Sequence, residues 1–308
     1  DSGLSLATTL RPANKTVFIM LLSVTACTQP ASRVAAFDAG VNMVSHVGDV
    51  DAIRTALTHV AETAHTRTPG GYTCPYCGMR GLTELALWHH MPLHHINTRA
   101  PPGRVKCPVC DQGVKEFQVH MHNAHRPASA GPPEDRSPAS LFAFALVVIR
   151  RPSDGRFLLV QEFANSGFWL PGGRVDKGED FMQAAIRESR EEAGIEIKLT
   201  GVLSVQSRAP AYEDGAMRTR VIFVGEPAPG FSTKFKTLPD FESVGAAWFS
   251  IEDILEPHPS VKWRGPEPQT WCGSVAHGGH VSPMTLFGVE GAAPPPAAGG
   301  SGAGRAPE

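Results

Sequence analysis

Three glutamates in the stretch Leu170–Ile195 have the spacing of a metal site. The stretch reads LPGGRVDKGEDFMQAAIRESREEAGI, and from Asp180 to Ala193 its composition predicts a helix with an inward apolar stripe. Glu188 precedes Glu191 by three residues and Glu192 by four, so the carboxylates share one helix face. Such carboxylates repel each other unless a hard cation with oxygen ligands, Mg²⁺ or Mn²⁺, neutralises them. A solvated, salt-bridged helix face is the alternative, but the joint spacing of glycine, arginine and glutamates favours the metal site.

This stretch resembles the Nudix box of the Nudix hydrolases, nearly position for position. The resemblance implies that the three glutamates ligate the metal and that the Gly173 carbonyl adds an oxygen. It also implies that Glu179 and Arg187 form a structural ion pair that ties the loop to the helix. Ser189 departs from the family, which usually has an apolar residue there. We expect this serine to loosen the packing behind the helix without removing a ligand.

The chemistry expected of such a site is hydrolysis of a pyrophosphate bond. Two phosphates held by a metal ion on the glutamate face are poised for in-line attack by water. Glu191 or Glu192 is a candidate base. A third candidate is Glu242 in LPDFESVGAAWF, because this position lies near the glycine end of the box in many Nudix folds. Its alternative role is that of a surface turn residue.

Residues outside the box must choose the substrate. Phe168 and Trp169 precede the metal loop and are candidates for a base pocket, while Arg208 and Arg218 are candidates for phosphate contacts. Each of these residues, taken alone, also fits a structural or surface role.

The amino-acid sequence around the box most resembles the branch of the family that acts on oxidised-guanine nucleoside diphosphates. An 8-oxo-dGDP-like substrate is therefore favoured. Pro210 resembles a marker of the ADP-ribose branch, and Tyr212 resembles one of the diadenosine polyphosphate branch. These two substrate classes rank second and third.

Two Cys-x2-Cys pairs, each followed by histidines, recur at a period near 30 residues. Aligning their His-Met dipeptides gives two sets of four zinc ligands, and the repeat resembles a pair of C2H2 zinc fingers. The predicted sets are Cys74, Cys77, His90 and His95 in the first finger, and Cys107, Cys110, His120 and His125 in the second. His94 is an alternative to His95. A chance His-rich surface is the alternative to zinc binding.

The charge pattern leaves the partner of the fingers open. Between Gly71 and Arg126 there are six Lys/Arg and three Asp/Glu, and the net charge of the 308-residue chain is −2. We see no Arg-rich recognition helix, so RNA or protein contact is as well supported as DNA reading. The thiolate pairs favour a reducing compartment, cytoplasmic or nuclear. The apolar run Val17–Val24 is too short to span a bilayer, so no membrane contact is expected.

Composition shifts predict five parts: residues 1–66, two fingers over 72–126, a linker over 127–140, the Nudix domain over 141–288 and a disordered tail over 289–308. The Nudix resemblance implies an α+β fold, an α/β/α sandwich. Residues 1–66 alternate helix and strand, which implies parallel strands with an exposed edge. They resemble the second half of a response-regulator receiver domain, a flavodoxin-like half-domain of a phosphorelay. Its phospho-accepting aspartate would precede Asp1, and its switch hydroxyl would be Ser23 or Thr25.

Two functions of different classes follow. The first is a Mg²⁺-dependent pyrophosphohydrolase that acts on a small nucleotide. The second is a non-catalytic signalling or nucleic-acid adaptor that uses the fingers and keeps a Nudix fold as a ligand sensor. The complete set of glutamates favours the enzyme, because a sensor does not need the metal face.

Overall fold

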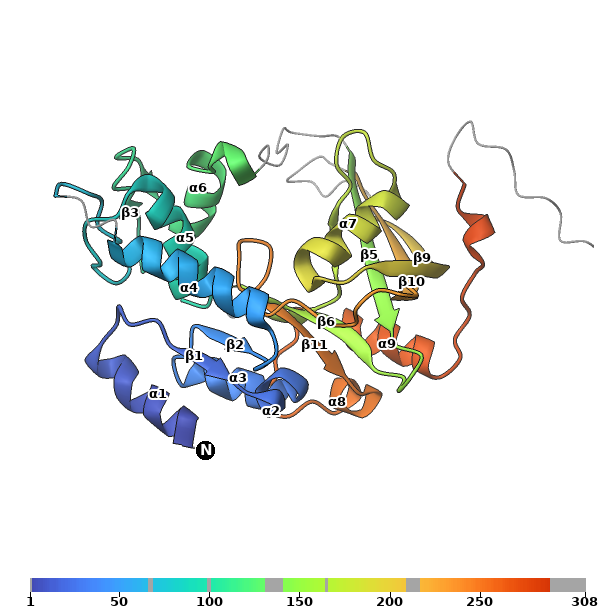
Figure 1. The fold of residues 1–308 in the computed structure, drawn as a ribbon. Helices are drawn as coiled ribbons and strands as arrows, with labels where there is room; N and C mark the ends of the chain where they lie inside the picture. The colour runs from blue at the N-terminus through green and yellow to red at the C-terminus, as the bar shows by residue number, and fades with distance from the viewer. Residues whose placement is uncertain are drawn as a thin grey trace, which may run out of the picture.

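The computed structural model describes residues 2–65, 69–98, 101–130, 141–163, 166–208 and 217–288. The predictions for Pro210, Tyr212, most of the 127–140 linker and the tail concern positions outside these ranges. The chain folds as an N-terminal segment (2–65), a Cys/His module (69–130) and a C-terminal domain (141–288), which lie against one another (Figure 1).

The C-terminal domain is built on a mixed β-sheet. Its elements are β5 (Leu141–Arg150), β6 (Phe157–Glu162), β7 (Gly167–Trp169), β8 (Gly172–Arg174), α7 (Phe181–Ala193), β9 (Ile197–Arg208), β10 (Met217–Pro227), β11 (Gly245–Phe249), α8 (Ile251–Leu255), α9 (Glu267–Ala276) and η2 (Met284–Leu286). Within the described ranges, seven strands form one sheet in the order β11-β6-β5-β10-β9, with β7 on β6 and β8 on β5. β5 and β10 run parallel, and the predicted hairpin of β5 and β6 is present.

Each face of this sheet carries its own apolar core. One core joins the sheet to Ala184 and Ala185 of α7, and the other joins it to Ile254 of α8 and Trp271 of α9. Helices therefore cover both faces, as expected of an α/β/α sandwich.

Helix α7 begins and ends where its sequence predicts. Asp180 and Gln183 form a capping box at its start, and Gly194 ends it in the left-handed conformation with φ 73°. Ser189 is fully buried, and its hydroxyl donates to the Ala185 carbonyl at 2.7 Å. The hydrogen-bonding need of this serine is thus met inside the helix.

The Cys/His module has a small core of its own. Its elements are α5 (Glu84–His95), β3 (Val105–Lys106), β4 (Gly113–Val114), α6 (Phe117–Ala124) and η1 (Ala128–Ala130). The core side chains Leu87 and Met91 of α5 pack with Phe117 and Met121 of α6. Two short helices with so few apolar contacts gain little from burial alone, which is typical of modules that a metal stabilises.

The N-terminal segment has the predicted alternation of helices and strands. Its elements are α1 (Ser2–Ala13), β1 (Met20–Leu22), α2 (Val24–Thr28), α3 (Pro30–Asp38), β2 (Met43–Ser45) and α4 (Val50–His65). β1 and β2 pair in parallel, as expected. The short helix α2 was not predicted; the side chain of Ser23, a candidate switch residue, accepts from the Ala26 N–H and caps it. A pair of strands does not establish a flavodoxin-like half-domain, so the receiver resemblance is not shown.

The predicted exposed strand edge is not seen at β2. All of its residues are buried, and Ser45 Oγ lies 3.1 Å from Thr237 Oγ1 of the C-terminal domain. Arg33 of α3 is also fully buried in this interface, where Nε donates to Gln161 Oε1 at 2.7 Å and Nη2 to the Val244 carbonyl at 3.1 Å. The C-terminal domain therefore covers the β2 side of this sheet. On the β1 side, where Leu22 is 44% exposed, the exposed edge stays a prediction.

Candidate active site

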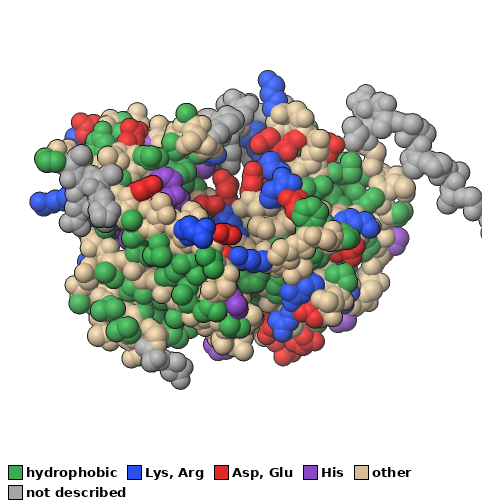
Figure 2. Space-filling view, in the orientation of Figure 1, with side chains coloured by type: hydrophobic (Ala, Val, Ile, Leu, Met, Phe, Trp, Pro, Cys, Tyr) green, Lys and Arg blue, Asp and Glu red, His purple; other side chains and the backbone are tan. Residues whose placement is uncertain are grey.

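A cavity of about 1060 Å³ lies between α7 and the Cys/His module. Its walls come from α7, the β7–β8 region, β10 and the connection before β11 on one side, and from α5 and α6 on the other. Figure 2 shows a hollow near the middle of this face with acidic and basic side chains around it. The cavity is large enough to enclose a nucleotide-sized ligand.

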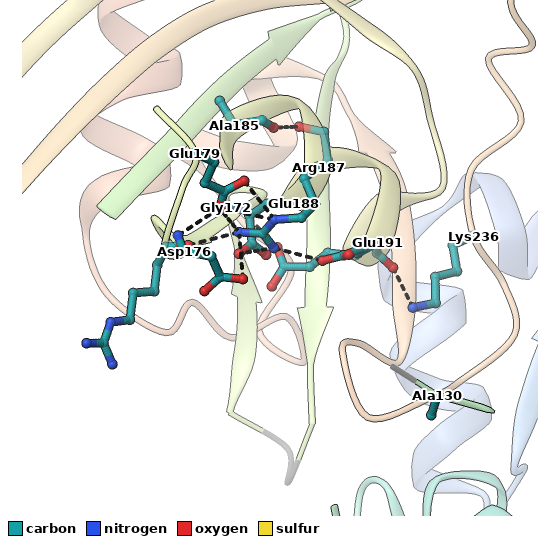
Figure 3. A network of polar contacts seen from close by, with 12 residues as sticks. Ala130, Gly172, Asp176, Glu179, Ala185, Arg187, Glu188, Glu191 and Lys236 are labelled. Atoms are coloured by element: carbon teal, nitrogen blue, oxygen red, sulfur yellow. Dashed lines mark hydrogen bonds and ion pairs between the residues drawn. The ribbon is translucent and has the colours of Figure 1, made fainter. Parts of the chain in front are cut away.

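The three predicted glutamates line this cavity but take different partners. Arg187 Nη1 donates to Glu188 Oε1 and to Glu191 Oε2, at 2.9 Å in each case. Glu192 Oε2 accepts the N–H of Gly172 at 2.9 Å. Figure 3 shows Arg187 directed at the carboxylates of Glu188 and Glu191.

The three carboxylates do not converge on one point. In the described part of the chain, the two Cys/His sets are the groups of three or more potential ligands whose atoms all lie within 4.8 Å of one another. The side chain of Glu191 is 42% exposed and is held by Arg187. The structure therefore places the glutamates on one wall, while their common ligation of an ion stays a prediction.

Arg187 and Glu179 form the ion pair that the sequence predicts. Arg187 Nη2 lies 2.6 Å from Glu179 Oε1 and also donates to the Arg174 carbonyl at 2.9 Å. Burial opposes the charge on Arg187, but the hydrogen bond to Glu179 and the charges of Glu188 and Glu191 raise the pKa of the guanidinium. This arginine therefore stays charged and joins the β8 loop to the helix.

The ionised forms of Glu188 and Glu192 are disfavoured in their protein surroundings. Burial, together with repulsion from Glu191 and Glu242, raises the pKa of Glu188 to about 7 despite the opposing effect of Arg187. Burial first, and then the charges of Glu188 and Glu162, raise the pKa of Glu192 well above its ordinary value. A divalent cation would stabilise the ionised forms, so this crowded set of oxygen donors fits a hard cation.

Glu242 lies on the same cavity wall as the box glutamates. The connection that carries it is tied to the end of α7, since Lys236 Nζ donates to the Glu191 carbonyl at 2.7 Å and Ser243 Oγ to the Glu192 carbonyl at 2.6 Å. The charge of Glu242 contributes to the raised pKa of Glu188. The predicted third candidate is therefore at the site rather than on a remote surface turn.

Of the predicted substrate-binding residues, Trp169 and Arg218 line the cavity. The assignment of Phe168 was wrong: this side chain is 1% exposed and packs on Phe249 in the core. Neighbouring residues of a strand point to opposite faces, so β7 can present only one of its two aromatic rings to the cavity. Arg208 pairs with Arg218 across β9 and β10 but is exposed and is not among the lining residues.

Several residues of the cavity were not predicted. Arg174 and Arg264 add positive charge, and Arg264 lies over the Trp169 ring at 5.7 Å. Gln118, His122 and Arg126 come from the Cys/His module. No local sequence signal marks them, because only the packing of the module against the domain brings them to the cavity.

The two predicted zinc-ligand sets are each brought together. In the first finger, Cys77 Sγ lies 3.3 Å from His90 Nε2, and Cys74 Sγ lies 3.4 Å from His95 Nε2. In the second, the Cys110 Sγ to His120 Nε2 distance is 3.3 Å and the Cys107 Sγ to His125 Nε2 distance is 3.5 Å. Ligands at about 2.0–2.3 Å from a tetrahedral zinc ion are separated by distances of this order.

The structure also separates His95 from its alternative, His94. His95 belongs to the first set, whereas His94 stacks on His90 at a ring distance of 4.3 Å. Burial lowers the pKa of His94 to about 2. In the second finger, Glu84 Oε1 lies 2.7 Å from His125 Nδ1, as is common for a carboxylate that orients a metal-bound imidazole.

Comparison with known proteins matches two parts of the chain. Residues 141–268 match the NUDIX domain family, and residues 71–126 match the zinc-binding domain of drought induced 19 protein (Di19). The chain is 29% identical over 140 residues to the 8-oxo-dGDP phosphatase NUDT18 of Homo sapiens, which covers 44% of this chain and 41% of that protein. It is 28% identical over 105 residues to the E3 ubiquitin-protein ligase KCMF1 of Bos taurus, covering 29% and 26%. A solved NUDIX hydrolase from Nitrosomonas europaea is 25% identical with a TM-score of 0.39, over 48% of this chain and 96% of that one.

These matches confirm a Nudix domain over residues 141–268 and a zinc-binding module over residues 71–126. The chain spans less than half the length of these curated relatives. The response-regulator and phosphorelay interpretation of residues 1–66 is not supported. None of the helices in the described part of the chain combines the length and apolar character that crossing a bilayer requires.

Proposed function

We propose that the Nudix domain hydrolyses the pyrophosphate bond of a small nucleoside diphosphate-linked molecule with Mg²⁺ or Mn²⁺. The observation that carries this proposal is the gathering of Glu188, Glu191, Glu192 and Glu242 on one wall of a nucleotide-sized cavity. A divalent cation held there would neutralise the diphosphate and activate a water molecule.

Acidic and basic residues of the cavity would have separate roles. The glutamates, with the carbonyl of Gly173, would hold the cation, and Glu191, Glu192 or Glu242 would accept the proton of the attacking water. Arg218 and Arg220 also line the cavity and would bind phosphate oxygens. Arg220 also donates to Gln206 Oε1 at 2.7 Å, which fixes its guanidinium in place.

We propose an 8-oxo-dGDP-like nucleotide as the substrate, with ADP-ribose and a diadenosine polyphosphate as the next candidates. The likeness to 8-oxo-dGDP phosphatase NUDT18 supports the first of these candidates. Trp169, with Arg264 against its ring, offers a flat aromatic surface on which a purine can stack.

The packing of the fingers argues against DNA reading by helix α5. Helix α5 packs between α4 and α6, where His89 stacks on His59 at a ring distance of 4.2 Å. A helix that reads the major groove must be free to enter it. Protein contact, through surfaces of the module other than these packed helices, is therefore our proposal for any partner that the fingers bind.

The test is product analysis by chromatography, with 8-oxo-dGDP, dGDP, ADP-ribose and diadenosine tetraphosphate as substrates in Mg²⁺. We expect 8-oxo-dGMP and phosphate to form fastest. Glu191→Gln should lower kcat roughly 100-fold or more. The matched control is Glu196→Gln, because Glu196 pairs with Arg190 near the end of α7 and lies away from the cavity. Hydrolysis that survives Glu191→Gln, or equal losses in both variants, would remove the assigned mechanism.

A further inference from the structure

The ring of Phe241 is held by both zinc fingers. It lies 4.9 Å from the Trp88 ring of α5 and 4.9 Å from the His122 ring of α6, at interplanar angles of 45° and 40°. Phe241 also packs on the apolar core of the Cys/His module. A side chain of the Nudix domain thus completes the hydrophobic core of the neighbouring module.

Phe241 is the residue before Glu242, the candidate base in the cavity. The connection 228–244 that carries both residues runs from β10 to β11 and reaches toward α4 and α5 (Figure 1). At its C-terminal end, Asp240 Oδ1 accepts the N–H groups of Glu242 at 2.9 Å and Ser243 at 3.1 Å. These bonds make residues 240–243 a tight turn, so a displacement of the Phe241 ring is passed on to Glu242.

The N-terminal segment holds the same connection from another side. Asp49 Oδ2 accepts from Thr237 Oγ1 at 3.0 Å, and Asp49 is also paired with Lys234. The connection is therefore held at three places. The N-terminal segment binds it before the turn, α7 binds it at Ser243, and the fingers contact Phe241. Only the last of these anchors is a set of aromatic contacts that depends on the fold of the Cys/His module.

We propose that the zinc-finger module is a working part of the Nudix active site, because it positions Glu242 through the contacts of Phe241 with Trp88 and His122. This inference rests on the proposed function and extends it to the role of the second module. Phe241, Trp88 and His122 are positioning residues in this assignment, and Glu242 is the group that they place.

The proposed zinc ions are close in sequence to the contacts of Phe241 with Trp88 and His122, a set of contacts that we call the clamp. Trp88 precedes the ligand His90 by two residues on α5, and His122 follows the ligand His120 by two residues on α6. Metal binding fixes both helices, since the core between them is small. The two ligand sets thus determine the distance between Trp88 and His122. This distance in turn determines where the Phe241 ring lies.

The test is a double-mutant cycle in the full chain with 8-oxo-dGDP and saturating Mg²⁺. We expect Phe241→Ala to lower kcat roughly 10- to 100-fold with KM changed by less than about threefold, because the loss is one of placement. We expect Phe241→Tyr to recover most of this loss. In a chain that carries Glu242→Gln, adding Phe241→Ala should change kcat by less than about twofold, since the group that Phe241 places is then already gone.

The matched control is Phe231→Ala, because Phe231 lies in the same connection but is 61% exposed. This change should leave kcat within about twofold of the wild-type value. Hydrogen exchange gives a readout apart from activity: Phe241→Ala should speed amide exchange at residues 240–243 while the zinc content per chain stays the same.

Two kinetic results would overturn the inference and leave the hydrolase assignment intact. One is an equal loss of kcat from Phe241→Ala in the presence and absence of Glu242→Gln, which would show that Phe241 does not act through Glu242. The other is a wild-type rate in Glu242→Gln. Unchanged amide exchange in Phe241→Ala would separately refute the role of Phe241 in holding residues 240–243. In contrast, a wild-type chain that hydrolyses none of the nucleotides would refute the proposed function itself.

Discussion

Gly173 faces Glu188 so closely that a β carbon at position 173 would overlap the Glu188 carboxylate. The neighbouring Gly172 is confined in another way, since a β carbon there would overlap the backbone of Ala145 and its φ is +146°. A carboxylate at the end of a flexible side chain can move aside, whereas a paired strand cannot. Gly173 is therefore needed for the position of Glu188, whereas Gly172 is needed for the pairing of β5 with β8.

Gly173→Ala is expected to damage activity more than stability. The added methyl group displaces the Glu188 carboxylate, and a displacement of about 1 Å at a catalytic group costs on the order of 100-fold in rate. Gly172→Ala should instead lower the free energy of unfolding by roughly 1–3 kcal/mol, because the strand must shift. Urea unfolding and kcat, measured on both variants, check this contrast. Equal loss of stability in the two variants would contradict it.

The stability of the chain should depend on pH and Mg²⁺ in a linked way. The folded-state pKa of Glu188, about 7, is raised above its ordinary value of 4.5. Between these values the unfolded chain has lost a proton that the folded chain keeps, so without a divalent cation the free energy of unfolding falls as the pH rises from about 4.5 to about 7. The contribution of this group is on the order of 2–3 kcal/mol at most.

Mg²⁺ should reverse this loss, because the cation binds the ionised carboxylates. We expect Mg²⁺ to raise the melting temperature more at pH 8 than at pH 5, by thermal unfolding in the two buffers. Glu188→Gln should flatten the pH dependence and reduce the Mg²⁺ effect. A Mg²⁺-induced shift of the same size at both pH values would argue against a cation at the glutamates.

Arg33 should contribute to the attachment of the N-terminal segment. Its guanidinium is fully buried, and burial lowers its pKa to about 10. Arg33→Met leaves Gln161 Oε1 and the Val244 carbonyl without their donors, which should cost about 1–3 kcal/mol. Urea unfolding measures this cost. Arg54→Met is the control, since Arg54 is 69% exposed and pairs only at the surface with Asp51, and a similar loss in both variants would refute the prediction.

The purified chain should contain two zinc ions, one in each Cys/His set. Mass spectrometry of the metals checks the count. His95→Ala should lower it to about one, because three ligands hold zinc less tightly than four. His94→Ala should leave it at two, since His94 is outside the first set. A loss of zinc from His94→Ala, but not from His95→Ala, would reverse the assignment of the ligand.

Features that depend on local spacing could be predicted from the sequence. The start and end of α7 follow from Asp180 and Gly194, whose capping preferences act within one helical turn. The zinc sets follow from Cys-x2-Cys pairs and from histidines six positions or fewer apart, since a ligand set needs close pairs. The ion pair of Glu179 and Arg187 was implied by the resemblance to the Nudix box, and the structure contains it.

The side of each element that faces the cavity, and the modules that contribute to the cavity, became known from the folded structure. Phe168 and Trp169 are adjacent aromatic residues of equal promise, and the pairing of β7 with β6 buries one and presents the other. Arg33 and Gln161 are 128 residues apart, and no periodicity in the sequence connects them. The contacts of Phe241 with Trp88 and His122 likewise join residues that are far apart in the sequence. Such contacts depend on how separate cores pack against one another, and packing of this kind is set by the shapes of whole surfaces rather than by the spacing of residues along the chain.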